Sequence, residues 1–193
     1  MVEQISKRKL ERGERNRVFI AIETSDEVIK EVARLQELLT GVKFTGKVTE
    51  LENLHLTLKF LGEIDDEKLE EVKKRLKEIK FSEMKLKLGK IGTFSIRGNP
   101  SIVWVKIEGK NIHELQKKID DALKGLFKPE ERFMSHLTIA RIKYVKDKKG
   151  FLERIDSINA RPIEFDVSEF KLKKSELKVL GPTYTDIITI SSS

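Results

Sequence analysis

The chain has no cysteine, which excludes disulfides, thiolate metal sites and a cysteine nucleophile. It also lacks long apolar runs, because no stretch approaches the roughly 18 residues that a membrane-spanning helix needs. The charged N-terminus contains no apolar segment of the kind that a secretory signal requires. These absences predict a soluble, cytoplasmic protein with no membrane-inserted part.

Histidine is scarce, with three in 193 residues, while 37% of the residues are charged. The charged residues are mostly Lys and Glu, a balance common in proteins from hot environments. Lys and Arg total 39 against 32 Asp and Glu, a net charge of +7. This excess favours an anionic partner such as nucleic acid, although an ordinary solvated surface could have the same composition.

One short motif occurs twice and holds two of the three histidines. The tetrapeptide HLTL at residues 55–58 returns as HLTI at residues 136–139. Residues i and i+2 of a strand share a face, so each copy should present an imidazole and a hydroxyl together while its aliphatic residues enter a core. Two such strands across a cleft would offer two imidazoles and two hydroxyls to one small group.

A strand and a helix precede each motif. The β-rich segment 18–23 leads to a capping box of Thr24 and Glu27 and an apolar helical stripe over 28–39 that Gly41 ends. At an offset of 85, strand 103–108 is followed by a cap of Asn111 and Glu114 and a stripe over 112–123. This repeat predicts two similar lobes related by a pseudo-twofold axis.

The remaining segments complete the predicted sheets. The first motif strand should end at Gly62, and Asp65 or Asp66 should cap a second helix. Strand periodicity is present at 84–88, within 163–172 and at 184–190, with a short helix near 151–158. Residues 1–16 have no period that could bury a face, which predicts a flexible basic extension.

With their flanks, the motifs resemble the twin HxTx motifs of the 2H phosphoesterase superfamily, and most closely those of the 2′-5′ RNA ligase family of RNA 2′,3′-cyclic phosphodiesterases. The resemblance rests on RVFIAI at 17–22, NLHLTLKFLG at 53–62, HLTIAR at 136–141, and FKL at 170–172 with Ser175 and Gly181-Pro182. Members commonly have proline directly before the second histidine, where this chain has Ser135, and they usually start near Arg17.

The resemblance implies an α+β fold over residues 17–193. It would be one domain of two pseudo-symmetric lobes, each an antiparallel sheet with helices packed outside, around a central cleft. The implied substrate is RNA with a 2′,3′-cyclic phosphate end, for which tRNA fragments are one candidate. We expect a monomer.

Opening a cyclic phosphate needs a base to take the proton of water and an acid to protonate the departing ribose oxygen, and two histidines can supply both near neutral pH. The near-symmetric motifs alone do not say which histidine is which. The family likeness makes His55 the proton donor to O3′ and His136 the proton acceptor, which leaves a 2′-phosphate. Thr57 and Thr138 are placed by strand period to donate hydrogen bonds to the phosphoryl oxygens. The chemistry requires no metal and no cofactor, and its reverse would give 2′-5′ ligation.

Three further residues are candidates for substrate binding. Arg141 is implicated by family likeness, but strand alternation puts it on the face opposite His136 unless a bulge intervenes. Lys59 is in phase with His55 and could line the cleft or be solvated. Phe19 could stack a base, although core packing is the favoured interpretation.

Several alternatives stay open at the level of sequence. The motifs could be hydrogen-bonded β-core residues, but two copies within a repeat favour function. Two histidines without a carboxylate cluster make a poor metal site. A non-catalytic RNA-binding module and a 2H phosphoesterase acting on small cyclic nucleotides are the other functional hypotheses. His113, in the first turn of a helix, is expected at the surface.

Overall fold

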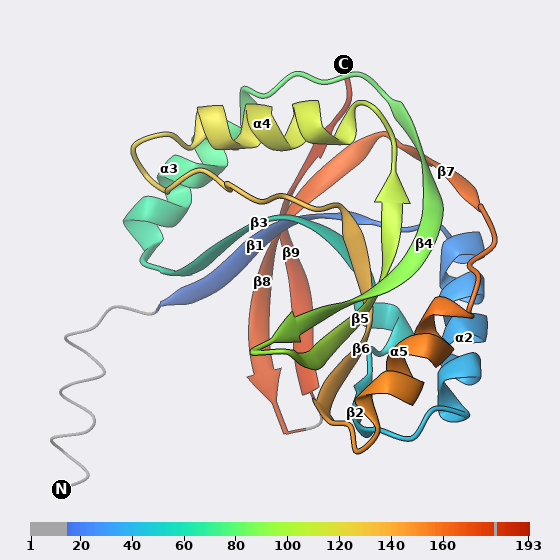
Figure 1. Cartoon of the computed structure of the whole chain (residues 1–193). Helices are drawn as coiled ribbons and strands as arrows, with labels where there is room; N and C mark the ends of the chain where they lie inside the picture. Colours follow the sequence, from blue (N-terminus) through green and yellow to red (C-terminus); the bar gives the residue numbers. More distant parts are fainter. Residues whose placement is uncertain (1–14, 180) are drawn as a thin grey trace, which may run out of the picture.

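Two antiparallel sheets form the framework of the protein (Figure 1). A computed structural model describes residues 15–179 and 181–193. The first sheet has the order β3-β1-β8-β9 and the second the order β2-β6-β5-β4-β7. The bounds of the strands are β1 Asn16–Glu23, β2 Thr45–Val48, β3 His55–Ile64, β4 Met84–Ile96, β5 Asn99–Glu108, β6 His136–Tyr144, β7 Glu164–Val167, β8 Glu169–Lys178 and β9 Gly181–Ser191.

Helices contact both sheets. Helix α2 contacts β6 and α5 contacts β4 of the second sheet, whereas α3 contacts β9 and α4 contacts β3 of the first. In Figure 1, α3 and α4 lie at one end of the molecule and α2 and α5 at the other. The bounds are α2 Asp26–Thr40, α3 Asp66–Lys77, α4 Ile112–Ala122 and α5 Lys148–Asp156, with a short 3₁₀ helix, η1, at Leu51–Asn53. The predicted α+β class with two antiparallel sheets is confirmed.

The predicted starts of α2, α3 and α4 are correct to within a residue, whereas α5, predicted near 151–158, already starts at Lys148 behind an Asp147 cap. Two of the predicted caps also differ. Ser25, not Thr24, caps α2, because its hydroxyl accepts a hydrogen bond from the Val28 amide. Thr24 lies one residue too early to reach that amide, and its hydroxyl is buried without a partner. Asp65 caps α3 as predicted. Asn111 precedes α4 in a helical conformation and makes no side-chain cap bond.

Strand ends and the basic extension also need correction. Strand β3 does not stop at Gly62 but continues to Ile64. The pairing with β1 is irregular next to Gly62, whose φ of 75° a glycine adopts without strain, so the strand can continue past this point. The short exposed strand β2 has no apolar alternation and was not predicted. The flexible extension predicted for residues 1–16 lies outside the described residues, except that Arg15 is exposed and Asn16 already starts β1.

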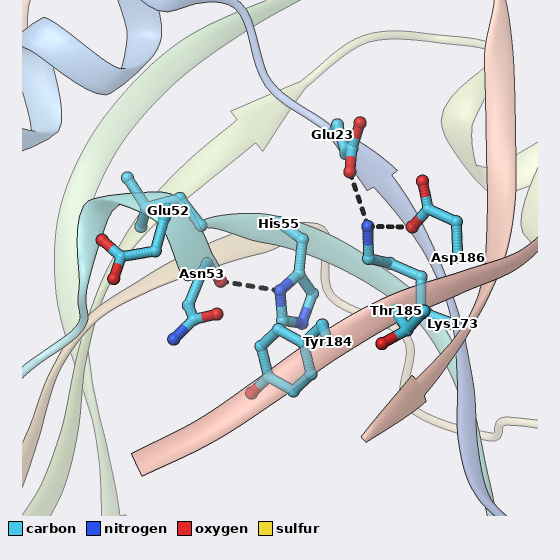
Figure 2. A pocket seen from close by; sticks show the side chains of 9 residues that line it. Glu23, Glu52, Asn53, His55, Lys173, Tyr184, Thr185 and Asp186 are labelled. Atoms are coloured by element: carbon cyan, nitrogen blue, oxygen red, sulfur yellow. Dashed lines mark hydrogen bonds and ion pairs between the residues drawn. The ribbon is translucent and has the colours of Figure 1, made fainter. Parts of the chain in front are cut away.

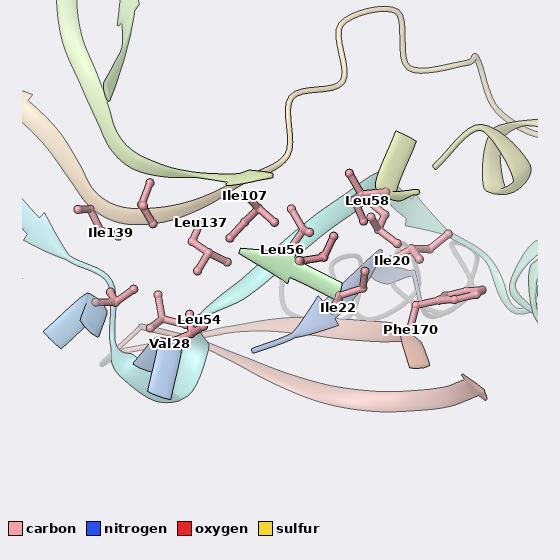
Figure 3. Close-up of a cluster of buried hydrophobic side chains, with 14 of the residues drawn as sticks. Ile20, Ile22, Val28, Leu54, Leu56, Leu58, Ile107, Leu137, Ile139 and Phe170 are labelled. Carbon is pink, nitrogen blue, oxygen red and sulfur yellow. The ribbon is translucent and has the colours of Figure 1, made fainter. Parts of the chain in front are cut away.

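One continuous cluster of buried apolar side chains connects the two sheets (Figure 3). Leu56 and Leu58 of β3 and Leu137 and Ile139 of β6 are at most 1% exposed within it. The aliphatic residues of both motifs therefore enter the core, as strand alternation predicts. No helix in the described part of the chain is long and apolar enough to cross a membrane.

Candidate active site

Each motif strand carries a β-bulge at the same place. In β3, Thr57 and Lys59 face consecutive residues of β1, so Leu58 is the extra residue. In β6, Thr138 and Ala140 face consecutive residues of β5, so Ile139 is extra. A bulge of this kind shifts the phase of every later side chain by one. The two lobes therefore share a local irregularity directly after His-x-Thr.

The two histidines are held in the same way. Nδ1 of His55 lies 2.8 Å from the carbonyl oxygen of Asn53, and Nδ1 of His136 lies 2.7 Å from that of Met134. A carbonyl oxygen only accepts hydrogen bonds, so Nδ1 of each ring carries the proton. Nε2 is then the atom left for chemistry, as an acceptor in the neutral ring or a donor in the charged ring.

Aromatic rings fix the imidazoles from the side. The Phe19 ring centroid lies 4.8 Å from that of His55. Tyr184, shown beside His55 in Figure 2, meets the imidazole edge-on with the ring centroids 5.1 Å apart. Phe94 meets His136 edge-on at 5.0 Å. These contacts restrict rotation of both rings and remove water from them.

Burial disfavours the charged form of both histidines. It lowers the pKa of His55 to about 4, although the Asn53 carbonyl opposes the shift in part. Burial also lowers the pKa of His136, against the effect of the Met134 carbonyl. The positive charge of Arg141 lowers the pKa of both rings. One guanidinium therefore lies within electrostatic reach of both imidazoles, and the two motif strands, β3 and β6, contact each other.

Arg141 reaches this site because of the bulge at Ile139. Strict alternation would have put it on the face opposite His136, whereas the phase shift returns it to the face of His136 and Thr138. The residue in the same position of the first motif is Phe60, which is 71% exposed. The two strands thus present different groups at equivalent places, a cation from one lobe and an aromatic ring from the other.

The two threonines are available as hydrogen-bond donors. Thr57 and Thr138 are partly exposed and lie on the same strand faces as His55 and His136. Within residues 15–179 and 181–193, neither hydroxyl has a protein hydrogen-bond partner. Hydroxyl, imidazolium and guanidinium groups are all donors of the kind that bind a phosphoryl anion.

Lys59 does not lie with the histidines. The bulge at Leu58 turns it toward helix α4, where Nζ lies 2.5 Å from Oδ1 of Asp120 and donates to the Lys128 carbonyl. Lys59 is 4% exposed. The expectation that it lines the cleft assumed unbroken alternation, and the bulge removes that assumption.

Phe19 lies next to the site but is covered. It is 3% exposed, with its ring between those of His55, Phe60 and Tyr184. A ring so enclosed offers no free face to a base, so its contact is with the imidazole itself. His113 is exposed on α4 as expected and contacts Phe133.

A pocket of about 440 Å³ opens beside His55 (Figure 2). We call it the His55 pocket. Its lining residues belong to β1, β8, β9 and the segment from η1 to the start of β3, and they are Glu23, Glu52, Asn53, Leu54, His55, Lys173, Tyr184, Thr185 and Asp186. On its wall, Nζ of Lys173 contacts both Glu23 and Asp186 at 2.5 Å. Burial alone would raise the pKa of Glu23, but hydrogen bonds from Lys171 and Lys173 lower it overall.

Sequence reasoning missed Tyr184 and this ion-pair network. A partial signal was present, because Phe170 and Leu172 alternate with Lys171 and Lys173, which places both lysines on the face away from the core. Their partners could not be read from the sequence, because they lie on other strands. Among the described residues, no group of three or more His, Cys, Asp or Glu could hold a metal ion.

Comparison with known proteins gives a consistent result. The family model described as LigT like Phosphoesterase matches residues 22–104 and 105–184. The chain is 38% identical to an RNA 2′,3′-cyclic phosphodiesterase of Methanocaldococcus jannaschii over 87% of this chain and 96% of the relative. It is 36% identical to the Archaeoglobus fulgidus protein of the same description over 89% of this chain and 97% of that one.

Solved structures agree in fold. A crystal structure of a Thermus thermophilus protein superposes with a TM-score of 0.73 at 26% identity, covering 91% of this chain and 97% of the other. E. coli LigT in complex with 3′-AMP superposes with a TM-score of 0.72 at 22% identity over 93% and 99% of the two chains.

Proposed function

Because the chain belongs to the LigT-like phosphoesterase family, we propose that it is an RNA 2′,3′-cyclic phosphodiesterase. The single observation that supports the proposal most strongly is the pair of equivalently held histidines on two strands, β3 and β6, that contact each other. The 2H resemblance of the sequence had led to the same family.

In the proposed reaction, water attacks phosphorus while Nε2 of His136 takes its proton. The P–O3′ bond breaks, and Nε2 of His55 gives its proton to O3′. The product carries a 2′-phosphate. Before the next turnover, His136 loses the proton it took and His55 regains one from solvent. The assignment of acid and base follows the family likeness, since the two rings are held alike.

The donors around the phosphate stabilise the transition state. Negative charge grows on the phosphoryl oxygens during attack, and in this proposal Thr57, Thr138 and Arg141 donate hydrogen bonds to it. Because these groups are fixed by two strands, they need little reorganisation as the charge develops. A bound phosphate anion also favours the imidazolium of His55, which burial otherwise disfavours.

The same geometry bears on the finer parts of the proposal. With a 5′-hydroxyl in place of water, the reverse reaction joins two ends through a 2′-5′ linkage. As the sequence predicts, we propose that the enzyme is monomeric and cytoplasmic, with tRNA fragments as one candidate RNA. Lys59 and Phe19 are left out of the proposed substrate contacts because of their burial.

Product mapping tests the function. The purified protein is incubated with an RNA oligonucleotide ending in a 2′,3′-cyclic phosphate, with and without EDTA, and the position of the product phosphate is determined. We expect a 2′-phosphate at the same rate in both samples. A 3′-phosphate would contradict the leaving group, and activity that requires an added divalent ion would contradict metal-free catalysis. RNA binding without turnover would reject the enzyme.

A further inference from the structure

We propose that this protein binds an RNA strand across the first sheet, with the terminal nucleoside in the His55 pocket and the phosphate on its 5′ side in a second pocket. The second pocket measures about 330 Å³. We call it the arginine pocket; its lining residues are Arg15, Arg17, Glu63, Lys174, Ser175, Glu176 and Leu177. The inference rests on the proposed function and specifies the class of substrate.

The His55 pocket is on the correct side of the phosphate for the nucleoside. In the proposed reaction O3′ leaves toward His55, so the ribose that carries O3′ lies on the His55 side and water enters from the His136 side. The lining residues of this pocket come from the end of β1, from the segment 52–55 that runs from η1 into β3, and from β8 and β9. None comes from β6, the strand of His136. The assigned roles and the position of the pocket therefore agree.

The charges of the His55 pocket favour a nucleoside over a second phosphate. Its lining contains three carboxylates, those of Glu23, Glu52 and Asp186, against the ammonium of Lys173. Lys171 also pairs with Glu23 and Asp186 from outside the lining, which leaves one negative charge in excess. A second phosphate would be repelled there. Hydroxyl and amino groups of a nucleoside could instead donate to the free carboxylate of Glu52, which has no ion pair within the described part of the chain.

The arginine pocket has the opposite character. It contains three cations against two carboxylates, and Lys174 lies 3.7 Å from one of these, on Glu176. Neither Arg15 nor Arg17 forms an ion pair or hydrogen bond with another of the described residues. A guanidinium with its donors free is suited to bind a phosphate through two parallel hydrogen bonds.

The two pockets are adjacent. Ser175 of the arginine pocket is the cross-strand partner of Tyr184 of the His55 pocket. Burial raises the pKa of Tyr184, and the charge of Arg17 is among those that oppose this rise, so Arg17 is within electrostatic reach of the phenol. Tyr184 links the two pockets, because it lines the His55 pocket, contacts the His55 ring and pairs with Ser175 of the arginine pocket.

The test compares two substrates that differ only in the 5′ extension: adenosine 2′,3′-cyclic phosphate, and a trinucleotide ending in the same group. The quantity measured is the ratio of kcat/KM for the trinucleotide to that for the mononucleotide, at low and at high salt. We expect a ratio of about ten or more at low salt, since the additional phosphate contact strengthens binding of the trinucleotide. The ratio should fall at high salt, because salt weakens phosphate contacts. Arg17→Ala should lower this ratio about tenfold and flatten its salt dependence.

Arg154→Ala is the matched control, because it removes the same charge from an exposed position on α5. It should leave both rate constants and their ratio unchanged. A ratio near one in the wild type, or a ratio that Arg17→Ala leaves intact, would overturn the second pocket while hydrolysis of both substrates upheld the proposed function. Failure of the wild type to hydrolyse either substrate would reject the proposed function itself.

Discussion

At the scale of single residues, catalysis depends on which ring nitrogen of each histidine carries the proton. Both rings donate Nδ1–H to the carbonyl of the residue two positions earlier, so the bond forms within the strand entrance itself. This local bond fixes the tautomer without a carboxylate partner. The ring then changes charge through Nε2 alone, which is the atom that a substrate can reach.

The lowered histidine pKa values predict an acidic optimum for kcat/KM. The free enzyme needs one histidine charged and one neutral, and its two apparent pKa values belong to the pair. Burial lowers the pKa of both rings from 6.5, that of His55 to about 4. The bell-shaped kcat/KM profile should therefore peak below pH 6.5 and fall as pH rises, because the imidazolium is lost.

The profile of kcat should lie at higher pH than that of kcat/KM. Bound phosphate is an anion beside the imidazoles and favours their charged form, which raises the pKa in the complex. Both profiles can be measured with one cyclic-phosphate oligonucleotide. A kcat/KM maximum on the alkaline side of neutral would contradict this electrostatic description.

The positions of the histidines and threonines could be predicted from the sequence because the i, i+2 pattern is purely local. Tyr184 could not be predicted, since it reaches His55 from β9, more than a hundred residues further along the chain. The burial that lowers the histidine pKa likewise comes from residues brought together by the fold. The local chemistry of the motifs was therefore predictable, whereas its environment was not.

At the scale of elements, the bulges decide which side chains share the site. The same single-residue shift brings Arg141 to the histidines and takes Lys59 away from them. Neither bulge leaves a mark in the sequence, because Leu58 and Ile139 continue the aliphatic alternation of their motifs. This is why alternation alone gave the wrong face for both residues.

Arg141→Met tests the electrostatic role of this phase shift. Loss of a donor to the phosphoryl oxygens should reduce kcat by about 100-fold. Loss of its positive charge should raise the pKa of both histidines and move the pH profile to higher pH. Lys143→Met, an exposed position two residues along the same strand, is the control and should do neither. A rate loss without a shifted profile would argue against proximity to the imidazoles.

The displaced Lys59 should matter for stability. Its ion pair with Asp120 joins β3 to α4, and the side chains are 4% and 10% exposed. Removing one partner of a buried pair costs about 3 kcal/mol, so Lys59→Met should lower the free energy of unfolding by this order. The exposed Lys117–Asp121 pair on the same helix is the control.

Lys117→Met should cost about 0.5 kcal/mol or less. Urea unfolding of the two variants measures the difference. Equal destabilisation by both substitutions would show that the Lys59 pair has no special structural weight.

At the scale of the whole molecule, the two sheets are interlocked through the chain order. The first sheet combines β1 and β3 from the start of the chain with β8 and β9 from its end, and the second includes β2 from the first half. The strand-helix-strand repeat was visible in the sequence because its apolar periods recur at a fixed offset. The assignment of the last strands to sheets depends on long-range pairing, which periodicity does not record.

This interlocking predicts that the chain unfolds as one unit. Since both sheets contribute to one buried cluster, neither can lose its packing while the other keeps it. The single tryptophan, Trp104, lies in β5 of the second sheet. Its fluorescence should therefore follow the same denaturant transition as far-UV circular dichroism, which reports on both sheets. Two separated transitions would instead indicate independently folding lobes.

The proposed mechanism requires one histidine from each lobe, and the rate of cyclic phosphodiester hydrolysis by three single variants tests this requirement most directly. His55→Ala and His136→Ala should each lose at least about two orders of magnitude in kcat while retaining the fold, as expected when a general acid or base is removed. His113→Ala, which removes the exposed third histidine, should keep the wild-type rate. Near-normal turnover by either motif variant would contradict the two-histidine mechanism.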